Sequence, residues 1–205
     1  MRRLALLVVL LLPCAAYAGA QKYEPLSDSV QAVLSHAISD QAPPRSSFLD
    51  SMDAVDWLSE MSLRLQKRIA DRESRLELLR AVHYEATRAG LDPQLVLGLI
   101  QVESGFKKYA VSSAGARGFM QVMPFWVKVI GRSEDNLFHL RTNLRYGCTI
   151  LRYYLDIERG DLYRALGRYN GSLGQAEYPN LVRDAWQKRW AYTSNRTGSR
   201  AASGN

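Results

Sequence analysis

The sequence has little cysteine and little histidine. Among its 205 residues are two cysteines, Cys14 and Cys148, and three histidines, His36, His83 and His139. Cys14 lies in an N-terminal segment that we expect to be removed, and a lone Cys148 excludes an intramolecular disulfide. Cys148 falls in the apolar row of a predicted helix and is interpreted as a core residue. The histidines lack the spacing of metal ligands, so the sequence predicts no metal site and no cofactor.

A long apolar run is also missing. The run over residues 4–12 is far shorter than the roughly 20 residues that a membrane-spanning helix needs. It follows two arginines and precedes the small-x-small site Ala16-Tyr17-Ala18, a pattern typical of a secretory signal peptide. We therefore predict that residues 1–18 are a cleaved signal peptide. The mature form is then expected in the periplasm, without a transmembrane helix.

The predicted cleavage leaves a modest positive charge. The net charge falls from +7 to +5, because two arginines and no acidic residue leave with the leader. Such a charge suits an anionic partner, although it is equally typical of a protein that is simply kept soluble. Export argues against nucleic acid as that partner. A lipid attached to Cys14 is a further alternative, which Pro13 disfavours because a small residue usually stands there.

No segment alternates polar and apolar residues at the strand period, and nearly every periodic segment has the helical period. The sequence therefore predicts an all-α protein. An amphipathic helix is expected around 30–37, and a second one over roughly 48–71, separated by Ala42-Pro43-Pro44. The second helix carries an apolar row made of Val55, Leu58, Met61 and Leu65.

Capping residues and glycines divide the rest of the chain into further helices. Ser74-Arg75-Leu76-Glu77 has the pattern of a capping box, and Gly90 is expected to end the helix that follows. Asp92-Pro93 predicts the start of the next helix, which stops at Gly105. We predict a helical domain over 76–192, a helical extension of unknown role over 19–75, and a disordered tail over 193–205. Later helices are expected at 124–130, 142–159, 161–169 and 179–190.

One acid falls on the apolar face of a predicted helix. Glu103 follows Val96, Leu99 and Ile100 at helical spacing, so all four share a face. Burial and the negative end of the helix dipole both raise the pKa of a carboxyl group there. A carboxylic acid that stays protonated near neutral pH can donate a proton to a leaving oxygen. Taken alone, a solvent-facing glutamate at a helix end is the simpler interpretation.

Three ordered motifs change that interpretation. They are Glu103-Ser104-Gly105, the segment 110–124 with Gly118-Phe119-Met120-Gln121, and Tyr169-Asn170-Gly171-Ser172. With these motifs the chain resembles, over roughly 76–190, the lytic transglycosylases whose domain has a goose-lysozyme-like fold. It departs from the family pattern in having Phe119 for leucine, Lys107-Lys108 for an Asn-containing pair, Arg168 for a small residue and Gly171-Ser172 for Ala-Gly.

The resemblance implies roles for individual residues. Glu103 matches the catalytic acid, and Tyr169 matches a tyrosine whose hydroxyl lies close to that acid, with Asn170 beside it. Asn143 and Gly147 match positions that serve packing. The residues expected to bind the sugar are Ser112, Gln121, Met123, Tyr169 and Asn170. Turn formation is the alternative for Ser112 and Asn170, and core packing is the alternative for Met123.

The resemblance also implies a reaction on peptidoglycan. Most glycosidases need two carboxyl groups, and no second motif-borne acid accompanies Glu103. In the family, one acid cleaves the bond between N-acetylmuramic acid and N-acetylglucosamine, and a 1,6-anhydromuramic product forms without water. A hydrolytic lysozyme and a non-catalytic peptidoglycan-binding module are the alternatives. The sequence identifies no envelope-spanning assembly as a partner and does not distinguish endo from exo cleavage.

Overall fold

The computed structural model describes residues 21–39 and 52–193, with side chains in the second range from residue 54 onward. Within these residues the chain is helical and contains no β-strand, which confirms the all-α prediction. None of the described helices has the length and apolar character needed to cross a membrane. The predicted signal peptide, the Pro-Pro break at 43–44 and the tail beyond residue 193 lie outside the described residues. The helices are α1 (Asp28–Ser39), α2 (Met52–Leu65), α3 (Arg72–Arg88), α4 (Pro93–Glu103), α5 (Phe125–Ile130), α6 (Leu140–Ile157), α7 (Leu162–Asn170), α8 (Glu177–Ala185) and the π-helical turn η2 (Trp186–Trp190).

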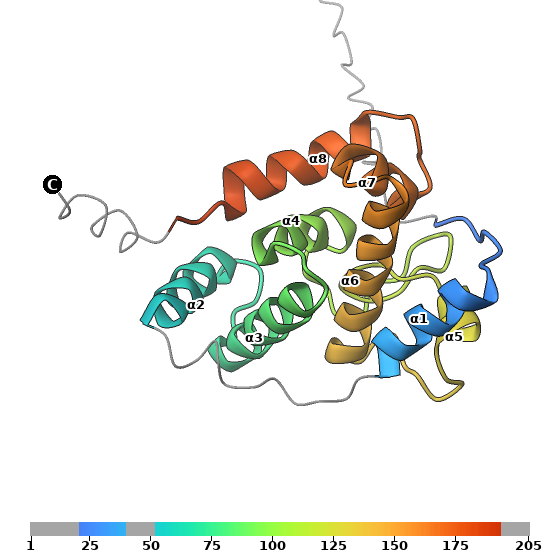
Figure 1. Cartoon of the computed structure of the whole chain (residues 1–205). Helices are drawn as coiled ribbons and strands as arrows, with labels where there is room; N and C mark the ends of the chain where they lie inside the picture. The colour runs from blue at the N-terminus through green and yellow to red at the C-terminus, as the bar shows by residue number, and fades with distance from the viewer. Residues whose placement is uncertain (1–20, 40–51, 194–205) are drawn as a thin grey trace, which may run out of the picture.

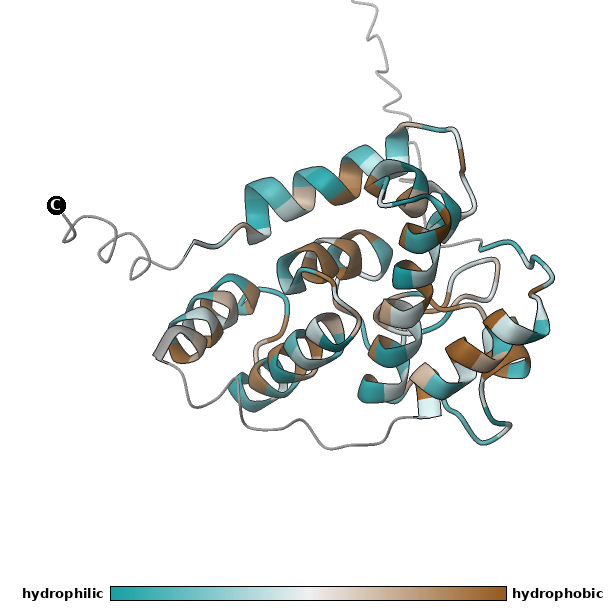
Figure 2. Cartoon of the chain, viewed as in Figure 1, coloured by the Kyte–Doolittle hydropathy of each residue, from teal (hydrophilic) through white to brown (hydrophobic). Residues whose placement is uncertain are grey.

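Helix α4 lies at the centre of the molecule (Figure 1), where it packs against α3, α8 and η2. Every residue from Leu95 to Ile100 is buried, so this stretch of the helix is enclosed on all sides, and much of its ribbon has the brown colour of hydrophobic residues in Figure 2. Gly98 permits the close approach of η2, since a Cβ atom there would lie 2.8 Å from the backbone nitrogen of Trp186. The residue at the end of α4 is therefore held inside the protein.

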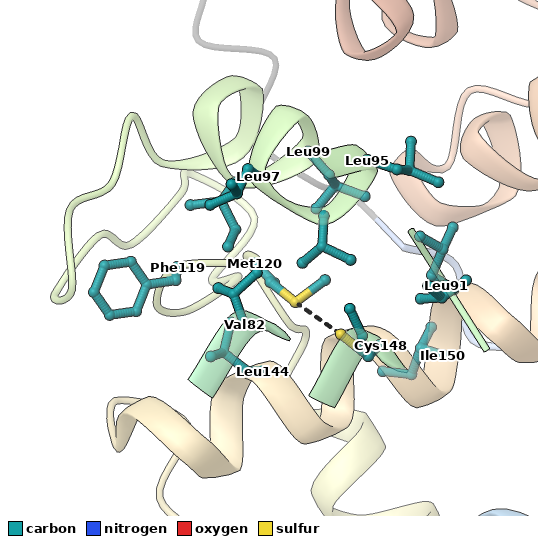
Figure 3. Packing of buried hydrophobic residues seen from close by; sticks show 14 of the residues in the cluster. Val82, Leu91, Leu95, Leu97, Leu99, Phe119, Met120, Leu144, Cys148 and Ile150 are labelled. Atoms are coloured by element: carbon teal, nitrogen blue, oxygen red, sulfur yellow. Dashed lines mark hydrogen bonds between the residues drawn. The ribbon is translucent and has the colours of Figure 1, made fainter. Parts of the chain in front are cut away.

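A loop methionine completes the core between α4 and α6 (Figure 3). Met120 and Cys148 are both fully buried, and their sulfur atoms lie 4.0 Å apart. Gly147 makes room for this methionine, because a Cβ atom there would lie 2.7 Å from the Met120 Cβ. Burial raises the pKa of the Cys148 thiol well above its usual range. These contacts confirm that Cys148 is a core residue and agree with the packing role expected for Gly147.

The helix boundaries follow local capping. The capping box predicted at Ser74 is wrong, because the N-cap of α3 is Asp71, three residues earlier. Asp71 accepts a hydrogen bond of 2.7 Å from the Ser74 nitrogen. Gly90 does end this helix, with a left-handed φ of 66°. The cap predicted for α4 is confirmed, since Asp92 accepts a bond of 2.6 Å from the Gln94 nitrogen.

The described part of the predicted N-terminal extension contains two helices, which pack on different parts of the rest of the chain. α1 packs against α5 and α6, whereas α2 packs against α3. α2 ends at Leu65 and is shorter than predicted, since Asp71 begins the next helix. Val55 is exposed, contrary to the predicted apolar row, and Ala54 and Trp57 are buried in its place. The three other residues of that row, Leu58, Met61 and Leu65, are buried as predicted.

Candidate active site

Glu103 is the last residue of α4, and its side chain is 5% exposed. The three residues predicted to share its face, Val96, Leu99 and Ile100, are fully buried. The Tyr178 hydroxyl donates a hydrogen bond to Glu103 Oε1. The acid is thus enclosed by apolar side chains and receives a hydrogen bond from a phenol, which rules out the solvent-facing interpretation. Its raised pKa stays a prediction.

Tyr178 belongs to α8 and is almost completely buried. Burial raises the pKa of its phenol well above the usual range, and the charge of Glu103 and the hydrogen bond to it act in the same direction. The phenol therefore stays protonated at any pH at which the enzyme would work. It acts as a fixed hydrogen-bond donor to the carboxyl group and not as a base.

Tyr169 lies nearby on α7 and is fully buried. Burial and then the charge of Glu103 raise the pKa of Tyr169 well above its usual range, so the two groups are close enough to interact electrostatically. Its hydroxyl, however, donates to the backbone oxygen of Met120, 2.7 Å away. The hydroxyl that donates a hydrogen bond to Glu103 belongs to Tyr178.

No role was assigned to Tyr178 from the sequence. A signal was present, because Tyr178, Val182 and Ala185 lie at i, i+4 and i+7 and share the buried face of α8. A tyrosine on such a face needs a partner for its hydroxyl. The spacing predicts burial of that hydroxyl but does not identify the partner, which comes from a residue 75 positions earlier.

The loop between α4 and α5 is held by side chains that bond to its backbone. Ser104 donates through Oγ to the Phe119 oxygen at 2.8 Å. Asn143 of α6 accepts from the Met120 nitrogen at 2.8 Å and donates to the oxygens of Arg117 and Leu137 at 2.8 and 2.9 Å. Asn143 is 1% exposed, and it fixes the loop beside Glu103. The packing role expected for this residue is thereby extended to hydrogen bonding.

Gln121 also stabilises the loop. Its Nε2 atom donates to the oxygens of Gly118 and Ala110, at 2.9 and 3.1 Å, and its backbone has a left-handed φ of 48°. Ser112 is half-buried, and its Oγ accepts a bond of 3.1 Å from the Ala116 nitrogen. For both residues, a contact with sugar stays a prediction beside a structural role that is already visible.

The two remaining predicted site residues follow the same pattern. Met123 is half-buried, and its backbone nitrogen donates to Gln21 Oε1 at 3.3 Å. Asn170 directly follows Tyr169 and donates through Nδ2 to the Ser172 hydroxyl at 3.0 Å. The structure therefore brings Glu103 and Tyr169 together, adds Tyr178, and leaves sugar contacts by Met123 and Asn170 as predictions.

The chemistry available at this site is proton transfer at one carboxyl group. Among the carboxylates of the described residues, Glu103 is the one whose charge raises the pKa of the Tyr169 and Tyr178 phenols. In the same part of the chain, no three His, Cys, Asp or Glu side chains gather closely enough to hold a metal ion. Burial favours the neutral acid, while the phenol of Tyr178 stabilises the carboxylate that remains after a proton leaves.

Comparison with known proteins places residues 80–190 in a family model described as Transglycosylase SLT domain. The chain is 39% identical over 88 residues to the Transglycosylase of Enterobacteria phage PRD1, a match covering 43% of this chain and 32% of that protein. It is 50% identical over 48 residues to Membrane-bound lytic murein transglycosylase C of Actinobacillus pleuropneumoniae serotype 5b, covering 23% of this chain and 13% of the relative. The protein of that name from Mannheimia succiniciproducens is 38% identical over 82 residues, or 36% and 23% of the two chains. The chain thus spans about a third or less of these relatives.

Proposed function

This chain belongs to the SLT transglycosylase domain family, and we propose that it cleaves the glycan strands of peptidoglycan as a lytic transglycosylase. The observation that carries the proposal is the buried carboxyl group of Glu103, which accepts a hydrogen bond from the Tyr178 hydroxyl. One carboxyl group is enough for this reaction because the nucleophile belongs to the substrate. The predicted signal peptide supports a periplasmic location, where peptidoglycan is found.

The first step is general acid catalysis. The protonated Glu103 gives its proton to the oxygen that links N-acetylmuramic acid to N-acetylglucosamine, and the bond from that oxygen to the muramic anomeric carbon breaks. Positive charge develops at the anomeric carbon, where the acetamido group of the substrate can stabilise it. The carboxylate left on Glu103 keeps the hydrogen bond from Tyr178, which lowers the free energy of the charged form.

The second step returns the proton. The Glu103 carboxylate takes the proton from the 6-hydroxyl of the muramic sugar, and the 6-oxygen forms a bond to the anomeric carbon. The product is a 1,6-anhydro sugar, no water is consumed, and Glu103 is protonated again. Both phenols near the acid have raised pKa values, so neither competes with Glu103 as the base.

Hydrolysis on the same fold is the second candidate. In a lysozyme reaction, water would attack the anomeric carbon in the second step and the product would carry a reducing end. That route needs a group that positions the water, usually a second carboxyl. The site described above offers one carboxyl and two protonated phenols, which favours the intramolecular nucleophile.

Digestion of purified peptidoglycan, followed by mass analysis of the soluble products, tests the proposal. We expect products lighter by one water than those of a lysozyme. Glu103→Gln should reduce the rate by about 10²–10⁴-fold, because the amide cannot transfer a proton. Gln66→Ala, a change at an exposed glutamine in the turn after α2, is the matched control and should leave the rate unchanged.

Three results would contradict different parts of the proposal. Full activity of the Glu103→Gln variant would remove this residue from catalysis. An inactive variant, combined with reducing-end products from the unmodified protein, would keep Glu103 as the acid and make the enzyme a hydrolase. Binding of peptidoglycan without any product would make the chain a binding module.

A further inference from the structure

A buried glutamine anchors the irregular segment that precedes α1. Gln21 is 3% exposed, although residues 21–27 form no helix or strand. Its Oε1 atom accepts hydrogen bonds from Trp126 Nε1, at 3.0 Å, and from the Met123 nitrogen, at 3.3 Å. Two donors from a distant part of the sequence thus converge on one amide oxygen, at the end of the loop that follows Glu103.

This glutamine lies close to the catalytic acid. The Gln21 side chain and the Glu103 charge both act on the Tyr169 phenol, the first lowering and the second raising its pKa. One buried phenol therefore separates the glutamine from the acid. Met123, which donates to Gln21, is also one of the residues that the family resemblance places against the sugar. The N-terminal segment thus contacts a residue that the proposed substrate is also expected to contact.

Leu26 packs against the hydrophobic core, and the residues between Gln21 and Leu26 are held by more exposed contacts. Tyr23 is 59% exposed and contacts the edge of Phe125, with ring centroids 5.6 Å apart. Glu24 forms an ion pair of 3.1 Å with Arg168, but its side chain is 57% exposed, and such surface pairs contribute little stability. Arg168 stands where the family pattern has a small residue, so this tether is a feature of the present chain. Release of residues 21–25 would break these contacts without unfolding a helix.

The chemistry of the anchor resembles that of the proposed substrate. A glutamine side chain and an N-acetyl group both present an amide oxygen as acceptor. The Gln21 side chain also forms a hydrogen bond with the Tyr169 phenol, which lowers the pKa of that phenol. An acetamide carbonyl could replace the glutamine carbonyl as acceptor for Trp126 Nε1 and the Met123 nitrogen. The pair of donors therefore suits the carbonyl oxygen of an acetamide as well as that of glutamine.

We propose that the Gln21 carboxamide occupies a subsite for an N-acetyl carbonyl of the glycan, so that residues 21–27 act as an intramolecular competitor of the substrate. The inference rests on the proposed function for the identity of the ligand. Acetylated glycan must displace the glutamine before it can bind, so the apparent affinity is lowered by the fraction of molecules in which the subsite is open. A glycan strand, which repeats the acetamide at many positions, can displace it by mass action.

The test measures binding of the trimer of N-acetylglucosamine by titration calorimetry, with all proteins carrying Glu103→Gln so that nothing is cleaved. Gln21→Ala should bind this trimer about 3–30-fold more tightly, the range set by an open fraction of roughly one third to one thirtieth. Gln21→Leu keeps an apolar side chain at the anchor without its carbonyl and should behave in the same way if the alanine variant is unstable. Gln66→Ala is the control and should bind like the parent.

The glucosamine trimer, which lacks acetyl groups, distinguishes competition for an acetamide subsite from simple steric blocking by the segment. Its affinity should be the same for Gln21→Ala and the parent. An equal gain in affinity for both trimers would contradict the acetamide subsite. Unchanged or weaker binding of the acetylated trimer to Gln21→Ala would show that residues 21–27 do not compete with the glycan. Absence of binding to every protein would also overturn it. The proposed function is decided separately, by the masses of the products from the protein with Glu103 intact.

Discussion

The loop between α4 and α5 and the N-terminal extension are held in place by opposite means. The loop has only isolated β-bridges and turn hydrogen bonds of its own, so several of its backbone groups are satisfied by buried polar side chains, above all Asn143 with its three hydrogen bonds. The extension is mainly helical and packs apolar faces on the domain, with polar links at its edges such as Gln31 to the Val129 oxygen at 2.7 Å. Backbone groups in a helix satisfy one another, whereas those in a buried loop need a partner from elsewhere. Single polar substitutions should therefore damage the loop far more than the extension.

The largest effect is expected for Asn143→Ala. This change leaves the Met120 nitrogen and the Leu137 oxygen without their Asn143 partner, whereas the Arg117 oxygen keeps its hydrogen bond from the Val122 nitrogen. Each unsatisfied buried group costs about 1–3 kcal/mol, so we expect the free energy of unfolding to fall by about 3–5 kcal/mol. Denaturant unfolding measures this. Asn180→Ala, at an exposed position of α8, should change stability by less than about 0.5 kcal/mol.

A similar small loss for both asparagine variants would contradict the comparison. It would mean that apolar packing of Met120 and Phe119 is enough to hold the loop. The peptidoglycan-cleaving rate gives a second readout, because a loop that has lost its support should also lose activity at temperatures at which the helices remain folded.

Tyr178 and Tyr169, the two buried tyrosines near Glu103, allow a bond to the acid to be compared with a bond to the loop. Tyr178→Phe removes the hydrogen bond to Glu103 and should lower turnover about 10–100-fold, since a bond to a charged group contributes about 1.5–3 kcal/mol. Tyr169→Phe instead removes the partner of the Met120 oxygen and should lower stability by about 1–2 kcal/mol, with a smaller loss of turnover. Turnover and denaturant unfolding of both variants are compared. A larger loss of turnover for Tyr169→Phe would restore the role that the resemblance gave to that residue.

The sequence predicted what depends on neighbouring residues. The cap at Asp92, the break at Gly90 and the buried face that ends in Glu103 all follow from local spacing, and the structure confirms them. The start of α3 was misplaced because two cap patterns lie within a few residues, and Asp71 makes the bond. Nothing local distinguishes Asp71 from Ser74 as the cap, since both residue types accept the same backbone hydrogen bond.

Contacts between distant segments could not be predicted in this way. The partner of Tyr178, the three partners of Asn143 and the burial of Gln21 each depend on how helices pack, and apolar periodicity gives only the face of each helix. The candidate site was therefore found through the acid and its motifs. Its hydrogen bonds required the structure.

The extension has one polar link whose loss should be measurable. Arg64 of α2 donates through one nitrogen to the oxygens of Arg189 and Ala191, at 3.0 and 2.9 Å. These carbonyls lie at the end of η2, so Arg64→Ala should lower the free energy of unfolding by about 1 kcal/mol and leave turnover unchanged. Arg72→Ala removes only an exposed pair with Glu73 and serves as the control. A loss of turnover in Arg64→Ala would show that the extension supports the active site directly.

The smallest effect concerns the contact between α2 and α3. His83 of α3 meets Trp57 of α2 edge to face, with ring centroids 5.3 Å apart, and burial lowers the pKa of His83 to about 4. In the unfolded chain a histidine has a pKa near 6.5, so between about pH 6.5 and 4 the unfolded state binds a proton that the folded state does not. His83 therefore makes the folded protein less stable as the pH falls through this window, and below about pH 4 its contribution is constant. Because the ring is only partly buried, about 1 kcal/mol is a reasonable size for the change.

Thermal unfolding of the unmodified protein and of His83→Gln, followed from pH 7.5 to pH 4, isolates this contribution from that of the carboxyl groups. Carboxyl titration is common to both proteins, whereas only one of them can bind a proton at residue 83. The difference in stability between the two should therefore shift in favour of the glutamine variant as the pH falls, by about 1 kcal/mol or a few degrees. Parallel curves would mean that the His83 ring opens to solvent as the pH falls and is protonated without separating α2 from α3. The contact with Trp57 would then be an edge contact that the extension can lose, in contrast to the fixed bonds of the loop beside Glu103.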